Sequence, residues 1–338
     1  MAGRVLVTGG SGFIAGYLIR ELVADGWTVH ATIRDLAREE AVRRLLAVDN
    51  QKVKFFAAEL MSDTGWAEAM AGCSHVAHVA SPFPTHMPKN ENEVIVPARD
   101  GALRVLRFAK AAGVKRFVMT SAAGAISHGR PRGEYTFTEK DWTNLESLEL
   151  SAYIKSKTIA ERAARDWVAA EGGGLEFCSI NPSVVLGPVW SSDFSPSLEV
   201  VKKLIEGSIP GCADLGFCLV DVRDVARLHV RALTAPGMAG ERFICAGPFL
   251  KMIDIARILK EKLGPQAHKV PLRKLPDFLL KLKSHFDPVI KLVVSELGRV
   301  RNMDTSHART LLGWAPRPVE ETIVETARSL IEMGVVRV

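Results

Sequence analysis

The sequence predicts an α/β fold in which helices cover both faces of a doubly wound parallel sheet. Short apolar runs alternate with segments of helical periodicity through the first half of the chain, and a glycine-rich turn joins the first such pair. Strands that alternate with helices form parallel sheets with right-handed crossovers. The length of 338 residues fits one large unit or two domains that share a cleft.

The first predicted strand leads directly into a turn, Thr8-Gly9-Gly10-Ser11-Gly12-Phe13-Ile14, that opens a predicted helix. Glycine has no side chain, so backbone N–H groups at such a turn can approach a pyrophosphate, and the start of the helix favours its negative charge. Ala15 occupies the third glycine position of the pattern, where alanine is tolerated. Because a strand precedes the turn and a helix follows it, we favour a Rossmann-type dinucleotide loop over a purely structural turn.

The remaining strands and helices are predicted from the same two patterns, short apolar runs for strands and helical periodicity for helices. The predicted strands cover residues 4–8, 28–33, 53–57, 75–79, 116–120 and 176–181. The predicted helices lie near residues 13–24, 37–48, 64–71, 97–112 and 152–170. Glycines end two of these helices, at Gly113 and at 172–174.

After Pro182 the pattern changes, because prolines divide the chain into short helices, with one more sheet segment expected at 242–245. We expect residues 1–182, with about 218–248, to form the dinucleotide-binding Rossmann domain. Residues 183–217 and 249–338 are expected to form a smaller, mostly helical substrate lobe over the carboxyl ends of the strands, where ligands of such sheets bind.

Composition excludes several classes of protein. The net charge of +6 is spread along the chain and not interleaved with aromatic residues, so we expect no nucleic-acid partner. We expect no leader, because the first predicted strand starts at Arg4, and no apolar run reaches membrane-spanning length. Five scattered cysteines suit a reducing compartment, so we expect a cytoplasmic protein with no membrane partner. The histidines form no zinc pattern, and no metal is expected.

Tyr153 and Lys157 lie four residues apart near the start of a predicted amphipathic helix, so they share one face, whereas Lys155 does not. An ammonium beside a phenol favours the phenolate and lowers a pKa that is ordinarily near 10. Such a phenol can give and accept a proton near neutral pH. A solvated helix face is the alternative, and the upstream dinucleotide loop argues against it.

Two further candidate site residues, Ser121 and Arg34, lie at the ends of predicted strands. Ser121 follows a predicted strand and is placed either to donate a hydrogen bond to a carbonyl oxygen or to cap a turn. Arg34 ends the second strand, where an arginine accommodates the 2′-phosphate of NADP and an acidic residue selects NAD. Asp35 follows it, so an offset of one residue would reverse the preference; we expect NADP(H), with NAD(H) possible.

Taken together, these motifs resemble the extended short-chain dehydrogenases/reductases, in particular the dihydroflavonol reductase-like group with its bacterial and yeast aldehyde and ketone reductases. The matching residues span nearly the whole chain. They are Thr8–Ile14, His78–Pro82, Glu93–Ile95 with Asp100-Gly101, Tyr153 and Lys157, Asn181–Ser183, Asp221–Val225, and Leu312–Trp314.

The resemblance implies roles at the matching positions. Tyr153 would be the general acid, and Lys157 would hold the nicotinamide ribose and tune Tyr153. The other implied cofactor contacts are Gly9, Gly12, Phe13 and Ile14 in the loop, Glu59 and Leu60 at the adenine, Ala80 beside the ribose and phosphates, and Pro182 and Ser183 in the nicotinamide pocket.

The chain departs from the family pattern in two places. The family's catalytic serine is replaced by Ala122, so Ser121 or Ser127 would take its role, or the site works without it. The plant flavonoid reductases carry an asparagine near Ser127, and its absence argues against a flavonoid-specific enzyme. Candidate substrate contacts are Ser127 and the apolar Phe83, Ile126, Val185 and Phe217, with Trp190 as a further candidate.

The expected function is therefore that of an NADPH-dependent carbonyl reductase, a reversible alcohol dehydrogenase for apolar or aromatic aldehydes and ketones. Its partner would be the small-molecule carbonyl or alcohol, and the protein would be a monomer or homodimer. The alternatives are a hydroxysteroid dehydrogenase/isomerase, a nucleotide-sugar epimerase or dehydratase, and a non-catalytic NADP-binding regulator.

Overall fold

The computed structural model describes residues 3–82, 88–191, 196–286 and 288–337. Its centre is a seven-stranded sheet in which every pairing is parallel. The strand order is β10 (Arg242–Cys245), β7 (Glu176–Pro182), β5 (Arg116–Thr120), β4 (His75–His78), β1 (Arg4–Val7), β2 (Thr28–Ile33) and β3 (Val53–Ala57). The predicted fold class is confirmed, and each of these strands lies within one residue of its predicted bounds.

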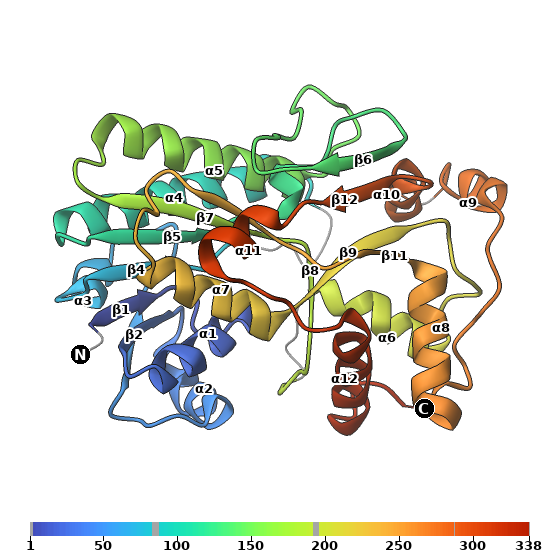
Figure 1. The fold of residues 1–338 in the computed structure, drawn as a ribbon, viewed down its shortest axis with the longest axis horizontal. Coiled ribbons are helices and arrows are strands. Elements are labelled where there is room, and N and C mark those ends of the chain that lie inside the picture. The colour runs from blue at the N-terminus through green and yellow to red at the C-terminus, as the bar shows by residue number, and fades with distance from the viewer. Residues whose placement is uncertain (1–2, 83–87, 192–195, 287, 338) are drawn as a thin grey trace.

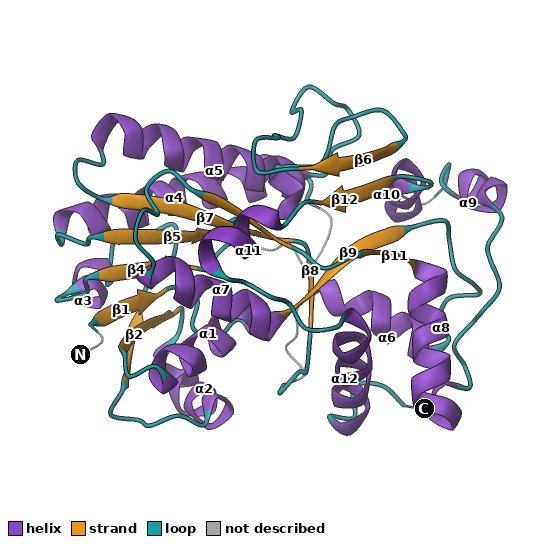
Figure 2. Cartoon of the chain, viewed as in Figure 1, coloured by secondary structure: helices purple, strands orange, loops and turns teal. Residues whose placement is uncertain are grey.

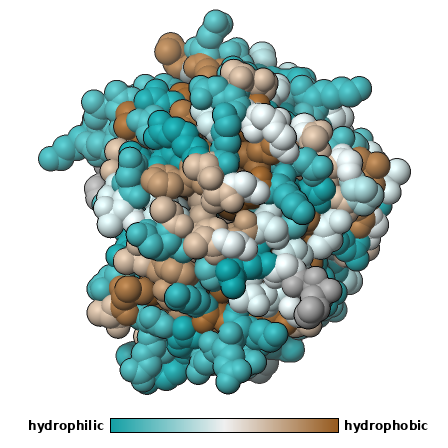
Figure 3. Space-filling view, turned by 90° about the vertical axis from the view of Figure 1, so that its left-hand side faces the viewer, coloured by the Kyte–Doolittle hydropathy of each residue, from teal (hydrophilic) through white to brown (hydrophobic). Residues whose placement is uncertain are grey.

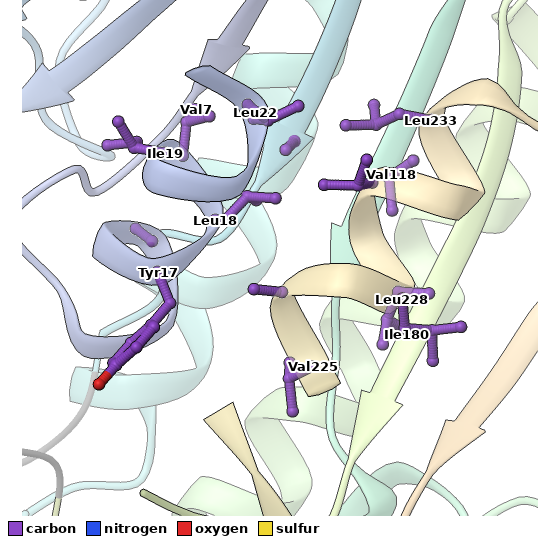
Figure 4. Close-up of a cluster of buried hydrophobic side chains, with 14 of the residues drawn as sticks. Val7, Tyr17, Leu18, Ile19, Leu22, Val118, Ile180, Val225, Leu228 and Leu233 are labelled. Carbon is purple, nitrogen blue, oxygen red and sulfur yellow. The ribbon is translucent and has the colours of Figure 1, made fainter. Parts of the chain in front are cut away.

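Helices cover both faces of this sheet (Figure 1). On one face lie α1 (Phe13–Ala24), α2 (Glu39–Leu46) and α7 (Val222–Thr234), and on the other α3 (Trp66–Met70), α4 (Asn92–Ala111) and α5 (Ala152–Glu171). Alternate strand residues serve the two faces, as the pleat requires. Val5 and Val7 join the cluster under α1 and α7, whereas Leu6 joins the cluster under α4 and α5. Figure 4 shows the first cluster, with Leu18 of α1 and Leu228 of α7 among its labelled members.

Helix α4 begins five residues earlier than its predicted start, at Asn92, and contains Pro97. Proline lacks the N–H for one helical hydrogen bond and is most common in the first turn of a helix. The structure places it in the second turn of the helix instead.

The fold also has two small sheets that the sequence analysis did not predict (Figure 2). One has the order β11 (Phe249–Lys251), β9 (Gly216–Asp221) and β8 (Val184–Leu186). The other pairs β6 (Glu134–Phe137) with β12 (Val300–Met303). Besides α7, the α-helices described after residue 182 are α6 (Glu199–Glu206), α8 (Met252–Leu263), α9 (Asp277–Lys283), α10 (Pro288–Glu296), α11 (Ser306–Leu312) and α12 (Val319–Glu332).

A separate apolar cluster holds α6, α8 and α12 together, and it supports the expected division into two lobes, which stays a prediction. Within the described part of the chain, no helix is both long and apolar enough to cross a bilayer. Figure 3 shows the face at the left of Figure 1, where hydrophilic residues surround smaller groups of hydrophobic ones.

Candidate active site

The glycine loop is tied to the neighbouring strand by Thr8. The Thr8 hydroxyl oxygen accepts hydrogen bonds from the amides of Val79 (3.0 Å) and Ala80 (2.9 Å), so its own proton is donated to Nδ1 of His78 (3.0 Å). Gly9 has φ +72°, and a Cβ added there would lie 3.1 Å from Cα of Ala80. The loop therefore needs glycine at this position for both its backbone conformation and its close approach to the segment that follows β4.

Helix α1 begins at this loop without a capping side chain. Its N-cap is Gly12, so the backbone N–H groups of the first turn have no side-chain acceptor. A cleft of about 230 Å³ opens beside the loop and is lined by Ser11, Arg38 and Trp190 as well as the loop glycines. Uncapped N–H groups, a helix N-terminus and glycines without side chains together fit a bound pyrophosphate.

Asp35 and Arg34, the charged residues that follow β2, have different surroundings. A carboxylate oxygen of Asp35 accepts from the amide of Ala37 (2.9 Å) and caps the short 3₁₀ helix Leu36–Arg38. Arg34 is exposed and has no hydrogen-bond or ion-pair partner among the residues that the structure describes. The capping role of Asp35 favours Arg34 as the candidate for contact with the cofactor, which stays a prediction.

Arg38, which the sequence analysis did not select, lines the same cleft as Ser11. The signal that could have found it is a second cation four residues after Arg34, just beyond the end of the predicted second strand.

Tyr153 and Lys157 lie in the first two turns of α5, whose N-cap Ser151 accepts a hydrogen bond from the amide of Ile154 (3.3 Å). The Lys157 ammonium nitrogen lies 5.9 Å from the Tyr153 ring centroid and donates to the carbonyl oxygen of Thr120 at 3.4 Å. Lys155 turns away and pairs with Glu91 (2.7 Å). The structure thus brings Tyr153 and Lys157 together, as their spacing predicts, and joins them to the end of β5.

The electrostatics differ from the expectation that Lys157 lowers the pKa of the phenol. Burial raises the pKa of Tyr153 to about 12, and burial lowers the pKa of Lys157 to about 8, with the carboxylate of Glu161 acting in the opposite direction on Lys157. The shift on Tyr153 is caused by its removal from water, and the Lys157 ammonium, which lies over the ring, donates to a backbone carbonyl oxygen. Tyr153 therefore holds its proton at neutral pH.

The serine candidates are engaged in local hydrogen bonds. The Ser121 hydroxyl donates to Oε2 of Glu161 at 2.6 Å, inside a buried polar network. The Ser127 hydroxyl donates to the carbonyl oxygen of Ala123 (3.1 Å) and lies 3.3 Å from Nδ1 of His128. In this conformation neither hydroxyl offers its proton to a substrate, contrary to the expected role of Ser121, and Ala122 has none to offer.

The end of β7 carries a polar atom that lacks a partner. The amide of Ser183 donates to the carbonyl oxygen of Cys245 (3.0 Å). Its hydroxyl is buried and makes no hydrogen bond within the described residues. A buried hydroxyl without a partner is costly, so this atom, directly after Pro182, fits contact with a polar group of a bound cofactor.

The remaining cofactor and substrate candidates have mixed placements. Glu59 and Leu60 are expected at the adenine. The carbonyl oxygen of Glu59 accepts from the indole N–H of Trp66 (3.1 Å), which holds the turn after β3, and Leu60 packs closely against Gly101. Phe83 lies outside the described residues.

The other apolar substrate candidates are mostly core residues. Ile126 is 0% exposed and packs in an apolar cluster, and Val185 is buried in the core under α1 and α7, so neither offers surface to a substrate in this conformation. Phe217 is half-buried on β9 and packs against the apolar cluster of α6, α8 and α12. Trp190 stacks on Tyr17, with 4.1 Å between ring centroids, beside the glycine-loop cleft.

A family model described as the NAD dependent epimerase/dehydratase family matches residues 5–246. The chain belongs to this family. Among curated relatives, it is 34% identical over 267 residues to dihydroflavonol 4-reductase of Gerbera hybrida, covering 76% of this chain and 72% of that protein. It is 31% identical over 305 residues to an anthocyanidin reductase of Vitis vinifera, covering 86% of each. The extended short-chain dehydrogenase/reductase resemblance is thereby confirmed, and the protein is an oxidoreductase of this family.

Solved structures agree on the fold of this family member. The yeast methylglyoxal/isovaleraldehyde reductase complexed with NADPH matches with a TM-score of 0.82 at 24% identity, over 98% of this chain and 99% of that one. Vestitone reductase from alfalfa matches with a TM-score of 0.78 at 24% identity, over 99% of this chain and 100% of that one. These likenesses cover nearly the whole chain.

Proposed function

We propose that this protein is an NADPH-dependent carbonyl reductase that acts on apolar or aromatic aldehydes and ketones. The observation that carries the proposal is the pair of Tyr153 and Lys157, a protonated phenol and a buried ammonium, in the same fold as an uncapped glycine loop. The names of the curated relatives, dihydroflavonol and anthocyanidin reductases among them, support reduction as the chemistry.

The chain's own residues account for the proton in this reaction. When bound, NADPH supplies a hydride to the carbonyl carbon. Tyr153 donates its phenolic proton to the carbonyl oxygen, and the raised pKa keeps that proton in place until the oxygen gains charge. The phenolate left on Tyr153 is stabilised by the nearby Lys157 cation. Alignment of these groups by α5 and the end of β5 supplies the geometric part of catalysis.

The preference for NADPH follows from charge around the glycine loop. Arg34 is exposed and unpaired within the described structure, Asp35 is engaged as a cap, and Arg38 lines the adjacent cleft. A 2′-phosphate would accept hydrogen bonds from such guanidinium groups. The neighbouring yeast reductase is described as a complex with NADPH, which agrees with this choice.

The test is NADPH oxidation by the purified protein against a panel of aromatic and aliphatic aldehydes and ketones, with NADH in parallel. We expect turnover that requires added NADPH. Tyr153→Phe should abolish the reduction and leave NADPH affinity nearly unchanged, since the ring stays and only the proton donor is removed. Full activity in that variant would reject the mechanism. Protein that carries tightly bound NAD and turns over without added cofactor would instead indicate an epimerase or dehydratase.

A further inference from the structure

Behind Lys157, one helical turn further along α5, lies a carboxylate that the proposed reaction does not use. Glu161 is 0% exposed, and its two oxygens accept hydrogen bonds from five side chains. On Oε2 the donors are Ser121 (2.6 Å) and Asn181 (2.8 Å); on Oε1 they are Ser179 (2.8 Å), Arg242 (2.7 Å) and Arg165 (3.2 Å). These donors come from β7, β10, α5 and the residue after β5, so one carboxylate joins four parts of the fold.

The same network reaches the segment that holds Lys157. Asn181 donates not only to Glu161 but also to the carbonyl oxygen of Ala122 (3.2 Å), and the Lys157 ammonium donates to the carbonyl oxygen of Thr120 (3.4 Å). The end of β5 is therefore held on one side by the ammonium and on the other by partners of Glu161. A shift of the carboxylate would move the acceptor on which Lys157 depends.

Charge balance also depends on Glu161. Burial alone would raise its pKa, but the guanidinium of Arg242, with help from Arg165, lowers the pKa to about 2, so the carboxylate stays charged. Arg242 also donates to the carbonyl oxygens of Glu139 (2.7 Å) and Asp141 (2.8 Å). Glu161 is thus the anion that offsets two guanidinium groups and the ammonium one turn away.

We propose that Glu161 is the positioning residue of this site: its carboxylate ties the ends of β5, β7 and β10 to α5 and holds Lys157 as a cation beside Tyr153. The link to catalysis rests on the proposed function, whereas the effect of Glu161 on Lys157 does not.

The groups that face Lys157 give the sign of the effect. Tyr153 and Glu161 share its helix, and His78 approaches from β4. Tyr153 and His78 are neutral at neutral pH, since burial raises the pKa of the phenol to about 12 and lowers that of the imidazole to about 3. Of these groups, Glu161 raises the pKa of Lys157. Neutralisation of Glu161 would leave the ammonium near buried guanidinium groups without that anion, so the pKa of Lys157 would fall.

The test is an isotope-edited NMR titration of the lysine Cε resonances. The resonance of Lys157 is assigned as the one that is missing from the spectrum of Lys157→Met. In Glu161→Gln the apparent pKa of Lys157 should fall by about 1 unit or more, as expected for loss of a nearby opposite charge. Glu161→Asp keeps the negative charge, so in that variant the pKa of Lys157 should lie close to its value in the unmodified protein. If Glu161→Gln does not fold, Arg165→Met serves instead: it removes a cation that offsets Glu161, and the pKa of Lys157 should rise.

Asp221 provides a matched control. It is also a buried carboxylate, at 1% exposure, that pairs with two arginines, Arg223 (2.8 Å) and Arg317 (3.3 Å), but it joins α7 to α12. Asp221→Asn should cost stability in the same way and leave the titration of Lys157 unchanged. A Lys157 titration that does not move in Glu161→Gln or Arg165→Met, or that moves equally in Asp221→Asn, would overturn the proposal.

The activity measurement separates this proposal from the proposed function. In Glu161→Gln, the pH above which kcat declines should move down together with the Lys157 titration, and Glu161→Asp should bring it back. If the unmodified protein reduces no carbonyl compound, the proposed function fails while the titration still decides the role of Glu161. If reduction occurs and its pH limit is the same in Glu161→Gln and the unmodified protein, Glu161 is structural only.

Discussion

Replacement of Gly9 by alanine tests the glycine loop most sharply, because the structure separates two costs. Gly9 has φ +72°, where an L-residue is strained by about 1–2 kcal/mol. The added Cβ would also lie 3.1 Å from Cα and 3.2 Å from Cβ of Ala80, closer than ordinary contact. Ala80 is held by the hydrogen bond from its amide to Thr8 (2.9 Å), so relief of the contact must lengthen that bond. Overpacking of this kind adds about 1–3 kcal/mol.

Gly113 supplies the matched control. It has φ +70°, and a Cβ added there meets nothing within 4 Å. Gly113→Ala should therefore show the backbone strain alone. We expect Gly9→Ala to have the lower free energy of unfolding by about 1–3 kcal/mol, as measured by urea denaturation. Its affinity for NADPH, measured by calorimetry, should be clearly weaker, whereas Gly113→Ala should bind NADPH as the unmodified protein does.

Either half of this comparison can refute the reasoning. Equal unfolding free energies in the two variants would show that the approach to Ala80 is not a constraint. Undiminished NADPH affinity in Gly9→Ala would show that the loop does not bind the pyrophosphate.

The remaining predictions concern the cofactor, the proton and the missing serine. Arg34→Ala should raise the dissociation constant of NADPH about 10- to 100-fold, the loss of a charge-assisted hydrogen bond, and leave that of NADH unchanged in fluorescence titrations; equal effects on both would reject the NADP preference. The reduction rate should be constant below about pH 8 and decline above it as Lys157 loses its proton, since burial lowers its pKa to about 8; a stopped-flow pH profile without that decline would contradict a cationic Lys157. Ala122→Ser should raise kcat about 10-fold or more if its hydroxyl reaches the carbonyl oxygen; an unchanged kcat would indicate that other groups already stabilise that oxygen.

The parallel sheet was predictable because its strands are buried on both faces and so appear as continuous apolar runs. β5 (Arg116–Thr120) was predicted to the residue. The small sheets were not, because β8 and β11 have three residues each and pair with β9 across distant parts of the chain. Segments this short carry no periodicity, and tertiary packing decides their conformation.

The site was predictable where spacing on one element decides it, and less so where burial does. Four-residue spacing placed Lys157 beside Tyr153. The direction of the pKa shift on Tyr153 was wrong, since spacing does not report how far a group is removed from water. The engagement of Ser121 also depends on a distant partner, Glu161, which lies 40 residues away in the chain.

The most direct measurement of the central claim is the fate of the transferred hydrogen. NADPH that carries deuterium at its transferable position should yield an alcohol with deuterium on the former carbonyl carbon, as detected by mass spectrometry, and Tyr153→Phe should form none while it binds NADPH normally. Oxidation of the cofactor without deuterium in the alcohol, or an undiminished yield of deuterated alcohol from Tyr153→Phe, would contradict the account.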